Sequence, residues 1–183
     1  MSRIGKQKIE LKSNVQATLT SDAHGVQTLK LKGPLGELSR AFKPEIVIKI
    51  EGSQIILTPK EESLFINALW GTYASHIMNM IEGVTTGFKK VLIIEGIGFK
   101  AAIAGEKMTF NLGFSHPVEM MIPKGIKVTV EKGNVTVTGI DKELVGLFCA
   151  RVVALKKPEP YKGKGIKYEG QVIKLKQGKK TIA

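Results

Sequence analysis

Two stretches of alternating apolar and polar residues lie eighty positions apart in this chain. Side chains of a strand alternate between the two faces of a sheet, so each stretch predicts a pair of strands with one buried face. The turn pairs Gly52-Ser53 and Gly133-Asn134 predict that each pair of strands closes as a tight hairpin. The apolar positions are Ile46, Ile48, Ile50, Ile55 and Leu57 in the first stretch, and Ile126, Val128, Val130, Val135 and Val137 in the second.

A helical pattern follows each hairpin. Apolar residues three and four positions apart predict a helix with one buried face. In Thr58-Pro59-Lys60-Glu61, a hydroxyl precedes proline, which predicts that Thr58 caps the first helix; Thr138 or Asp141 is expected to cap the second. Lys156-Lys157-Pro158 predicts where the second helix ends. The predicted faces are Ile66, Leu69, Trp70, Tyr73, Ile77, Met80 and Ile81 in the first helix, and Leu144, Leu147, Phe148, Val152 and Leu155 in the second.

Further short strands precede each hairpin, and their order indicates the fold class. Strands grouped together and followed by one helix predict an α+β protein. We expect two similar domains from an internal duplication, each a mainly antiparallel sheet with a helix packed on one face, plus a basic C-terminal tail. The expected bounds are 1–82 and 83–170 for the domains and 171–183 for the tail, with a hinge at 82–87. The additional strands are expected at 15–19, 28–31, 91–94, 99–103 and 108–112.

The charge of the chain indicates an anionic partner. It has 28 Lys and Arg against 16 Asp and Glu, a formal net charge of +12, and ten of the cationic residues lie in the last 34 positions. Clustered cations bind polyanions by releasing counterions. Lysine outnumbers arginine strongly, which favours docking on phosphates over reading of bases.

Other features exclude several classes of protein. The single Cys149 excludes a disulfide framework and a cysteine zinc site. The longest apolar run, at 144–155, is too short for a membrane span and contains Arg151. Because no apolar signal core follows Met1, we expect a cytoplasmic protein with no membrane partner.

One glycine-rich stretch imitates a nucleotide site. Gly96-Ile97-Gly98-Phe99-Lys100-Ala101 follows a predicted strand, as a dinucleotide fingerprint does. That fingerprint needs a helix directly after it, and the continuation at 101–107 is too short for one. A loop that approaches a phosphate, with Lys100 beside it, fits better; a nucleotide-binding enzyme is a much weaker alternative.

No catalytic constellation is found in the sequence. His24, His76 and His116 lack the spacing of metal ligands, and Cys149 is expected in the core. We therefore expect no enzyme activity, no cofactor, no metal and no small-molecule substrate.

The stretch Lys156–Tyr168 combines lysines, prolines, glycines and two tyrosines. The lysines suit phosphates, while Gly163 and Gly165 would let the backbone approach them closely. Tyr161 and Tyr168 would stack on bases or riboses splayed out of an RNA helix. This composition predicts an RNA-docking loop.

These features resemble a known family, the bacterial type of ribosomal protein six of the large subunit, over essentially the whole chain. The resemblance implies a non-catalytic protein of the ribosome that binds large-subunit ribosomal RNA near the sarcin–ricin loop. It also implies neighbouring ribosomal proteins at the stalk base, with translational GTPases docking nearby. A general RNA-binding or chaperone protein is the alternative. The matching stretches are 1–6, 32–36, 83–88, 96–101, 112–118 and 158–168.

The resemblance and the charge pattern together imply a set of RNA-binding residues. Within it, Lys156–Tyr168 would be the main binding loop, with Ser115 and His116 in a neighbouring loop where His116 donates a hydrogen bond. Phe99-Lys100 stands where the family commonly has Tyr-Arg, and Ala74 stands where many relatives have arginine. The set is Arg3, Lys6, Gly98, Lys100, Ser115, His116, Lys156, Lys157, Pro160, Tyr161, Lys162, Gly163, Lys164, Gly165, Lys167, Tyr168, Lys174 and Lys176.

Overall fold

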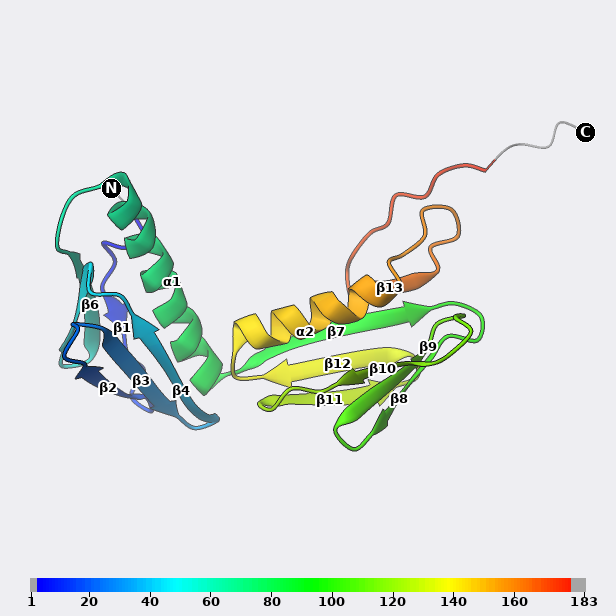
Figure 1. Ribbon diagram of the computed structural model, residues 1–183, viewed down its shortest axis with the longest axis horizontal. Coiled ribbons are helices and arrows are strands. Elements are labelled where there is room, and N and C mark those ends of the chain that lie inside the picture. The colour runs from blue at the N-terminus through cyan, green and yellow to red at the C-terminus, as the bar shows by residue number, and fades with distance from the viewer. Residues whose placement is uncertain (1–2, 179–183) are drawn as a thin grey trace, which may run out of the picture. The chain divides into compact units, whose positions relative to one another are not determined.

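A computed structural model describes residues 3–178 of the chain and groups them into two compact units (Figure 1). The first unit comprises the described residues up to Phe88, together with Ile140–Lys142. The second comprises Lys89–Gly139 and the described chain from Glu143 onward. Each unit has a buried apolar cluster of its own, and the two clusters share no residue.

The first unit packs one helix on two small antiparallel sheets, of strand order β2-β3-β4 and β1-β6-β5. The helix α1 lies against β3, β4 and β6. The backbone N–H of Ile48 in β5 donates to Oε1 of Gln27 in β3 at 2.9 Å, which links the two sheets. The elements are β1 Ile9–Glu10, β2 Gln16–Ser21, β3 Gln27–Gly33, β4 Gly36–Phe42, β5 Ile46–Glu51, β6 Gln54–Pro59 and α1 Leu64–Thr85.

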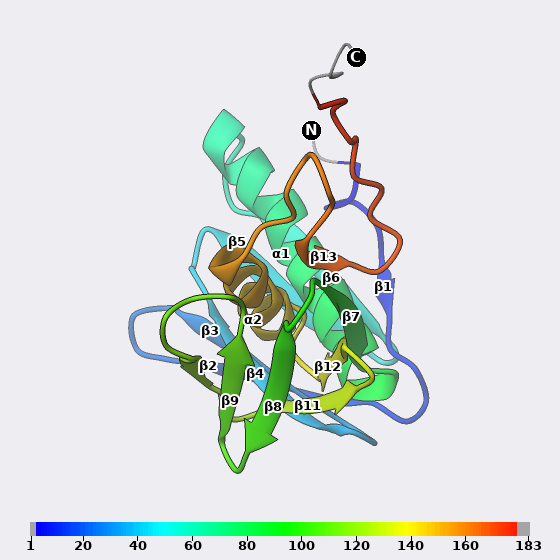
Figure 2. The same ribbon diagram turned by 90° about the vertical axis from the view of Figure 1, so that its right-hand side faces the viewer.

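The second unit also divides its strands between two sheets, of order β11-β12-β7-β13 and β10-β9-β8. The β8 strand lies beside β11 (Figure 2). Buried residues of α2 share a cluster with Leu92 of β7 and with Val135 and Val137 of β12. The elements are β7 Phe88–Glu95, β8 Lys100–Ala104, β9 Lys107–Asn111, β10 Val118–Met121, β11 Ile126–Glu131, β12 Asn134–Gly139, α2 Lys142–Leu155 and β13 Gly165–Tyr168.

The duplicated α+β architecture predicted from the sequence is confirmed. The hairpin β11–β12 has the bounds of β5–β6 shifted by eighty residues, and each hairpin is followed by a helix. The five additional strands expected from the sequence are present as β2, β3, β7, β8 and β9. The pattern did not predict β1, β4, β10 or β13, nor the division of each unit into two sheets.

The predicted turn of the second hairpin is wrong by one residue. Asn134 pairs with Glu131, so the two-residue loop consists of Lys132 and Gly133. Their φ angles are 45° and 86°, and positive φ at both central positions is what a type I′ hairpin turn requires.

The predicted start of the first helix is also wrong. Thr58 and Pro59 continue β6, where they pair with Val47 and Ile46 of β5. The helix begins at Leu64, and Oγ of the N-cap residue Ser63 accepts the Ile66 N–H at 3.1 Å. The hairpin pairing holds Thr58 in extended backbone, so its hydroxyl is not placed at a helix end.

In the second copy, Thr138 lies within β12 and pairs with Lys127, so it does not cap the helix. Asp141, the other candidate, directly precedes α2. The helix ends at Leu155, where the Lys156-Lys157-Pro158 pattern predicted its end.

The buried face of α1 agrees with its apolar pattern, although Leu69 is only half-buried. Ala74 is fully buried on the same face, so this position does not reach the surface.

The face of α2 is rotated from the prediction, because Val145 and Cys149 are buried with Phe148 and Val152, whereas Leu147 is 52% exposed. Apolar residues surround much of this helix, so tertiary packing decides which of them face the core. Cys149 is a core residue, as expected, and burial raises the pKa of its thiol.

The segment 82–87 is not a free hinge, since α1 continues through it to Thr85. The Thr86 N–H still donates to the Glu82 carbonyl oxygen at 2.8 Å. Gly83 is buried, and a Cβ there would overlap the carbonyl oxygen of Ile140 within the same unit. Close packing therefore explains this glycine.

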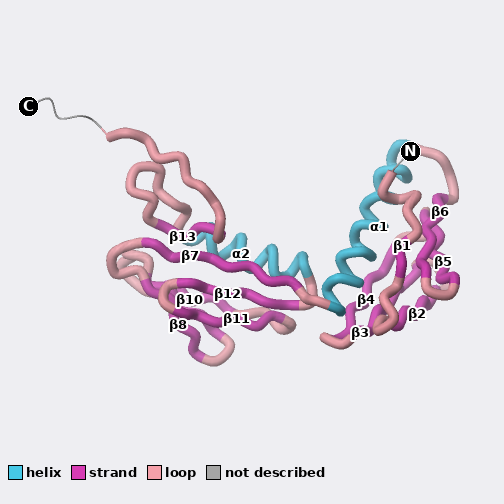
Figure 3. The backbone as a smooth tube through the Cα atoms, turned by 180° about the vertical axis from the view of Figure 1, so that it is seen from behind, coloured by secondary structure: helices cyan, strands magenta, loops and turns pink. Residues whose placement is uncertain are grey.

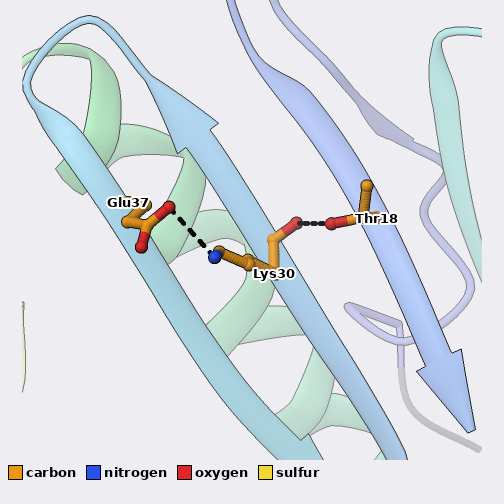
Figure 4. A network of polar contacts seen from close by, with 3 residues as sticks. All are labelled: Thr18, Lys30 and Glu37. Atoms are coloured by element: carbon orange, nitrogen blue, oxygen red, sulfur yellow. Dashed lines mark hydrogen bonds and ion pairs between the residues drawn. The ribbon is translucent and has the colours of Figure 1, made fainter.

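The sheet β2-β3-β4 carries exposed polar contacts (Figure 4). The Thr18 hydroxyl donates to the Lys30 carbonyl oxygen at 3.3 Å, and Lys30 Nζ lies 3.1 Å from Glu37 Oε2. This ion pair neutralises Lys30 locally, which makes Lys30 a useful control position below.

Neither α1 nor α2, the two helices of residues 3–178, is long and apolar enough to cross a membrane.

Candidate nucleic-acid interface

The segment after α2 is held in shape by its own backbone. It runs as a loop into the short strand β13, which pairs antiparallel with β7 (Figure 3). The Glu159 N–H donates to Lys164 O at 2.8 Å, and the Gly163 N–H donates to Glu159 O at 3.0 Å. The Ile166 N–H donates to Lys156 O at 2.8 Å. These backbone hydrogen bonds fix the shape of the loop, which lowers the conformational entropy that it would lose on binding.

The two glycines of this loop are explained by its fold. Gly165 has φ 141°, and a Cβ there would lie 2.6 Å from the Lys157 carbonyl oxygen. Gly163 has φ 71°, which favours glycine in the turn that it makes. Close approach of the chain to itself therefore accounts for Gly165. The close approach to a phosphate expected from the sequence stays a prediction.

Three segments that the sequence marked separately converge on one groove of about 420 Å³. Ile97 and Phe99 come from the glycine-rich stretch, and Leu112 and Gly113 come from the loop directly after β9. The remaining residues come from the segment after α2. We call this the lysine groove; it is lined by Ile97, Phe99, Leu112, Gly113, Lys156, Lys157, Glu159 and Lys164.

The lysine groove is cationic, since its lining has three lysines and one carboxylate. Lys162 lies exposed on the same loop. Among the described residues, neither Lys162 nor Lys164 forms an ion pair with a carboxylate. Their charges are therefore available to an anionic partner.

Gly98 and Lys100 are the sequence neighbours of Phe99, which lines the groove. Lys100 is exposed at the start of β8, directly after the lining residue Phe99. Gly98 has φ 77°, and a Cβ there would meet no atom within 4 Å. The space beside the Gly98 Cα is therefore open, and the approach of a phosphate to this backbone stays a prediction.

Two predicted contact residues are engaged within the protein. Lys167 Nζ lies 2.6 Å from Glu95 Oε1, so this ion pair ties β13 to β7. The Tyr168 ring packs against the core of the second unit, with Lys90 Nζ 5.2 Å from its centre. Partial burial raises the pKa of the Tyr168 hydroxyl. These side chains hold β13 against the rest of the second unit. The sequence did not predict this strand.

Four other predicted residues of the second unit are exposed and lie in two further segments. Ser115 and His116 lie in the loop between β9 and β10. Lys174 and Lys176 follow β13, where the Lys176 N–H donates to Pro160 O at 2.8 Å and brings the tail beside the binding loop.

The predicted residues of the N-terminus belong to the other unit. Arg3 and Lys6 are exposed in the first unit, so the structure does not bring them into the lysine groove. Gly5 between them packs closely on the Trp70 ring. Residues 1–2 of the first matching stretch and 179–183 of the predicted tail lie outside the described residues.

Sequence reasoning missed two exposed apolar side chains near the groove, Ile97 and Phe114. Each directly follows a glycine with positive φ, in a loop where no strand or helix period calls for an apolar residue. An apolar residue in such a place is the signal that could have identified them.

The geometry of the glycine-rich stretch does not suit a dinucleotide. The strand β8 follows it directly, so no helix N-terminus is placed to hold a pyrophosphate. Within residues 3–178, no group of three or more His, Cys, Asp and Glu side chains could hold a metal ion.

Comparisons with known proteins agree with the internal repeat. The model of the family described as "Ribosomal protein L6" matches residues 12–87 and 95–169, one match for each copy of the repeat. The chain is 45% identical to "Large ribosomal subunit protein uL6" of Hydrogenobaculum sp. (strain Y04AAS1), over 98% of this chain and 96% of that protein. It is 46% identical to the protein of the same name from Trichodesmium erythraeum (strain IMS101), over 98% of both chains.

Proposed function

Since this chain belongs to the ribosomal protein L6 family, we propose that its second unit docks on large-subunit ribosomal RNA through the lysine groove. The chain is a structural component of the large ribosomal subunit and not an enzyme. The observation that carries the proposal is the convergence of three separate segments on one cationic groove.

The docking mechanism is electrostatic. Phosphates displace counterions when lysines neutralise them, which supplies binding free energy without any chemical step. Lys156, Lys157 and Lys164 line the groove, and Lys162 extends the same charge from the exposed loop. Because backbone hydrogen bonds already fix this loop, the lysines hold their spacing before the RNA arrives.

Other residues of the second unit extend the contact. Tyr161 is 53% exposed and offers a ring for stacking, while Ser115 and His116 offer hydrogen-bond donors from a neighbouring loop. Lys174 and Lys176 continue the positive charge along the tail.

In the first unit, Arg3 and Lys6 would make a separate contact with RNA phosphates. The family resemblance supports a location of the chain near the sarcin–ricin loop and the stalk base. Neighbouring ribosomal proteins and docking translational GTPases would then lie close by.

The first prediction tests the charges. Replacing Lys162 and Lys164 with Ala removes two phosphate contacts, so log Kobs should depend less steeply on log salt concentration, by roughly 1.5 in slope. The measurement is a titration of the full chain with a large-subunit rRNA fragment that contains the sarcin–ricin loop, repeated at several salt concentrations.

The matched control is the double variant Lys30→Ala and Lys107→Ala, because both lysines are ion-paired, with Glu37 and Glu119. We expect its slope to stay near that of the wild-type chain. An unchanged slope for the Lys162 and Lys164 variant would contradict the proposal. Equally tight binding of unrelated RNA would favour a general RNA-binding protein instead.

The proposed location has its own test. Chemical footprinting of assembled large subunits, with and without the chain, should show protection near the sarcin–ricin loop. Protection confined to a distant part of the RNA would contradict this location while leaving RNA binding intact.

A further inference from the structure

The surface around the lysine groove includes apolar groups that phosphates cannot use. Ile97 lines the groove and is 89% exposed, and Phe114 is 46% exposed beside the lining residue Gly113. Lys156 joins the two, because it lines the groove with Ile97 and lies over the Phe114 ring. A ligand that covers the groove and this ring would meet apolar and cationic groups together.

The Phe114 ring is held at the groove by a cation. Lys156 Nζ lies 4.9 Å from the ring centre, within the range of a cation–π interaction. Lys156 also lines the groove, so the ring and the ammonium group form one composite surface. Leu112, two residues earlier, is buried, whereas the chain turns at Gly113 and leaves Phe114 outside the core.

We propose that Phe114, held by Lys156, is a stacking site for an unpaired nucleotide, so that this groove selects RNA with a bulged or looped-out base over a regular duplex. This rests on the proposed RNA docking and names the class of RNA that the groove takes. A nucleotide out of the stack presents a flat base next to a phosphate, which matches an aromatic ring beside lysines.

A regular RNA duplex does not match the groove equally well. Its bases are stacked on one another, so it presents phosphates and 2′-hydroxyls but no free base face. Phe114 and Ile97 would then remain without apolar contact. An apolar protein partner fits less well still, because it would cover Lys156, Lys157 and Lys164 without supplying anions.

The site would tolerate any base. Phe114 has no hydrogen-bonding atom in its side chain, and the neighbouring Ile97 has none either. Stacking depends on the face that every base presents, so the selected feature is the unpaired state of the nucleotide and not its identity.

The test uses two blunt-ended RNA duplexes without terminal loops, which are identical except that one carries a single bulged nucleotide. The wild-type chain should bind the bulged duplex roughly tenfold more tightly than the regular one. Phe114→Ala and Phe114→Leu should both reduce this preference to about one, whereas Phe114→Tyr keeps the ring and should retain it. The salt slope of all three variants should stay near that of the wild-type chain, since no lysine is removed.

A fluorescent base analogue at the bulge gives a second readout. Stacking on the ring should quench its emission when the wild-type chain binds, and Phe114→Ala should not quench it. Phe65→Ala is the matched control, because Phe65 is 63% exposed in the first unit and should leave both preference and quenching unchanged.

The outcomes separate the two proposals. Equal binding of both duplexes by the wild-type chain would overturn the nucleotide site and leave lysine docking intact. Retained preference in Phe114→Ala would also overturn it, whatever the salt slope. Failure of the wild-type chain to bind either duplex or the ribosomal fragment would overturn the proposed docking itself.

Discussion

A lysine contributes to RNA binding only where no carboxylate already neutralises it. Lys164 and Lys167 are three residues apart in one cationic stretch and look equivalent in the sequence. In the fold, Lys164 lines the groove whereas Lys167 is ion-paired with Glu95. In the proposed docking, the loop would therefore neutralise fewer phosphates than it has lysines.

A prediction at the residue scale follows from this ion pair. Glu95→Gln releases Lys167 and removes a negative charge, so RNA binding should tighten and the salt slope should steepen by about one counterion. Lys167→Ala should change the slope by much less than Lys164→Ala does. The measurement is the same salt titration with the ribosomal RNA fragment.

Glu37→Gln is the control for Glu95→Gln, because Glu37 is ion-paired with Lys30 in the first unit. The salt slope of the Glu37→Gln variant should not steepen. If Lys167→Ala flattens the slope as strongly as Lys164→Ala, the ion pair does not withhold Lys167 from RNA.

Strand pairing and helix capping decide where the helices and strands of this protein begin and end when the local sequence favours more than one position. Thr58-Pro59 by itself predicts a helix start, but both residues pair with β5 in the hairpin. Ser63 then caps α1 five residues later. Similarly, the composition of Gly165–Tyr168 predicts part of a docking loop, but these residues form a strand because they pair with β7.

The helix start gives a prediction at the element scale. Ser63→Ala removes the acceptor for the Ile66 N–H and should lower the free energy of unfolding by about 1 kcal/mol. Thr58→Ala should cost clearly less, since its hydroxyl makes only a 3.5 Å contact with Val47 O. Urea unfolding of the two variants beside the wild-type chain measures both values. The reverse order of costs would place the cap at Thr58.

On the scale of the whole molecule, two separate cores support the fold. Phe42 is buried in the cluster of the first unit and Phe110 in that of the second. Each unit buries its own sheet faces against its own helix, which is what a duplicated architecture requires of both copies.

Separate cores predict separate effects of core substitutions. Phe42→Ala should destabilise the first unit by about 3–5 kcal/mol and speed hydrogen exchange in β3 and β4, with β11 and β12 staying protected. Phe110→Ala should destabilise the second unit and speed hydrogen exchange in β11 and β12, with β3 and β4 staying protected. Exchange measured by mass spectrometry on peptides from each unit checks this. Faster exchange throughout the chain in either variant would mean that the two units unfold as one.

Patterns in the sequence predicted much of the fold and part of the site. The eighty-residue repeat, both hairpins and the face of α1 followed from periodicity, and the burial of Cys149 followed from the preference of a free cysteine for the core. The segments that line the lysine groove were each marked, but as separate stretches. Phe114 was not, because an exposed aromatic ring in a loop has no period that reveals it.

The sequence by itself determined both hairpins, both helices and five of the further strands, because alternation and helical spacing are set by neighbours within a few residues. Only the tertiary structure decided which apolar residues of α2 face the core, where α1 begins, that β13 exists and that three distant loops share one groove. The physical reason is that these outcomes depend on the free energy of contacts between segments far apart in the chain. A local sequence pattern does not reveal this free energy, because it comes from the packing of the whole unit.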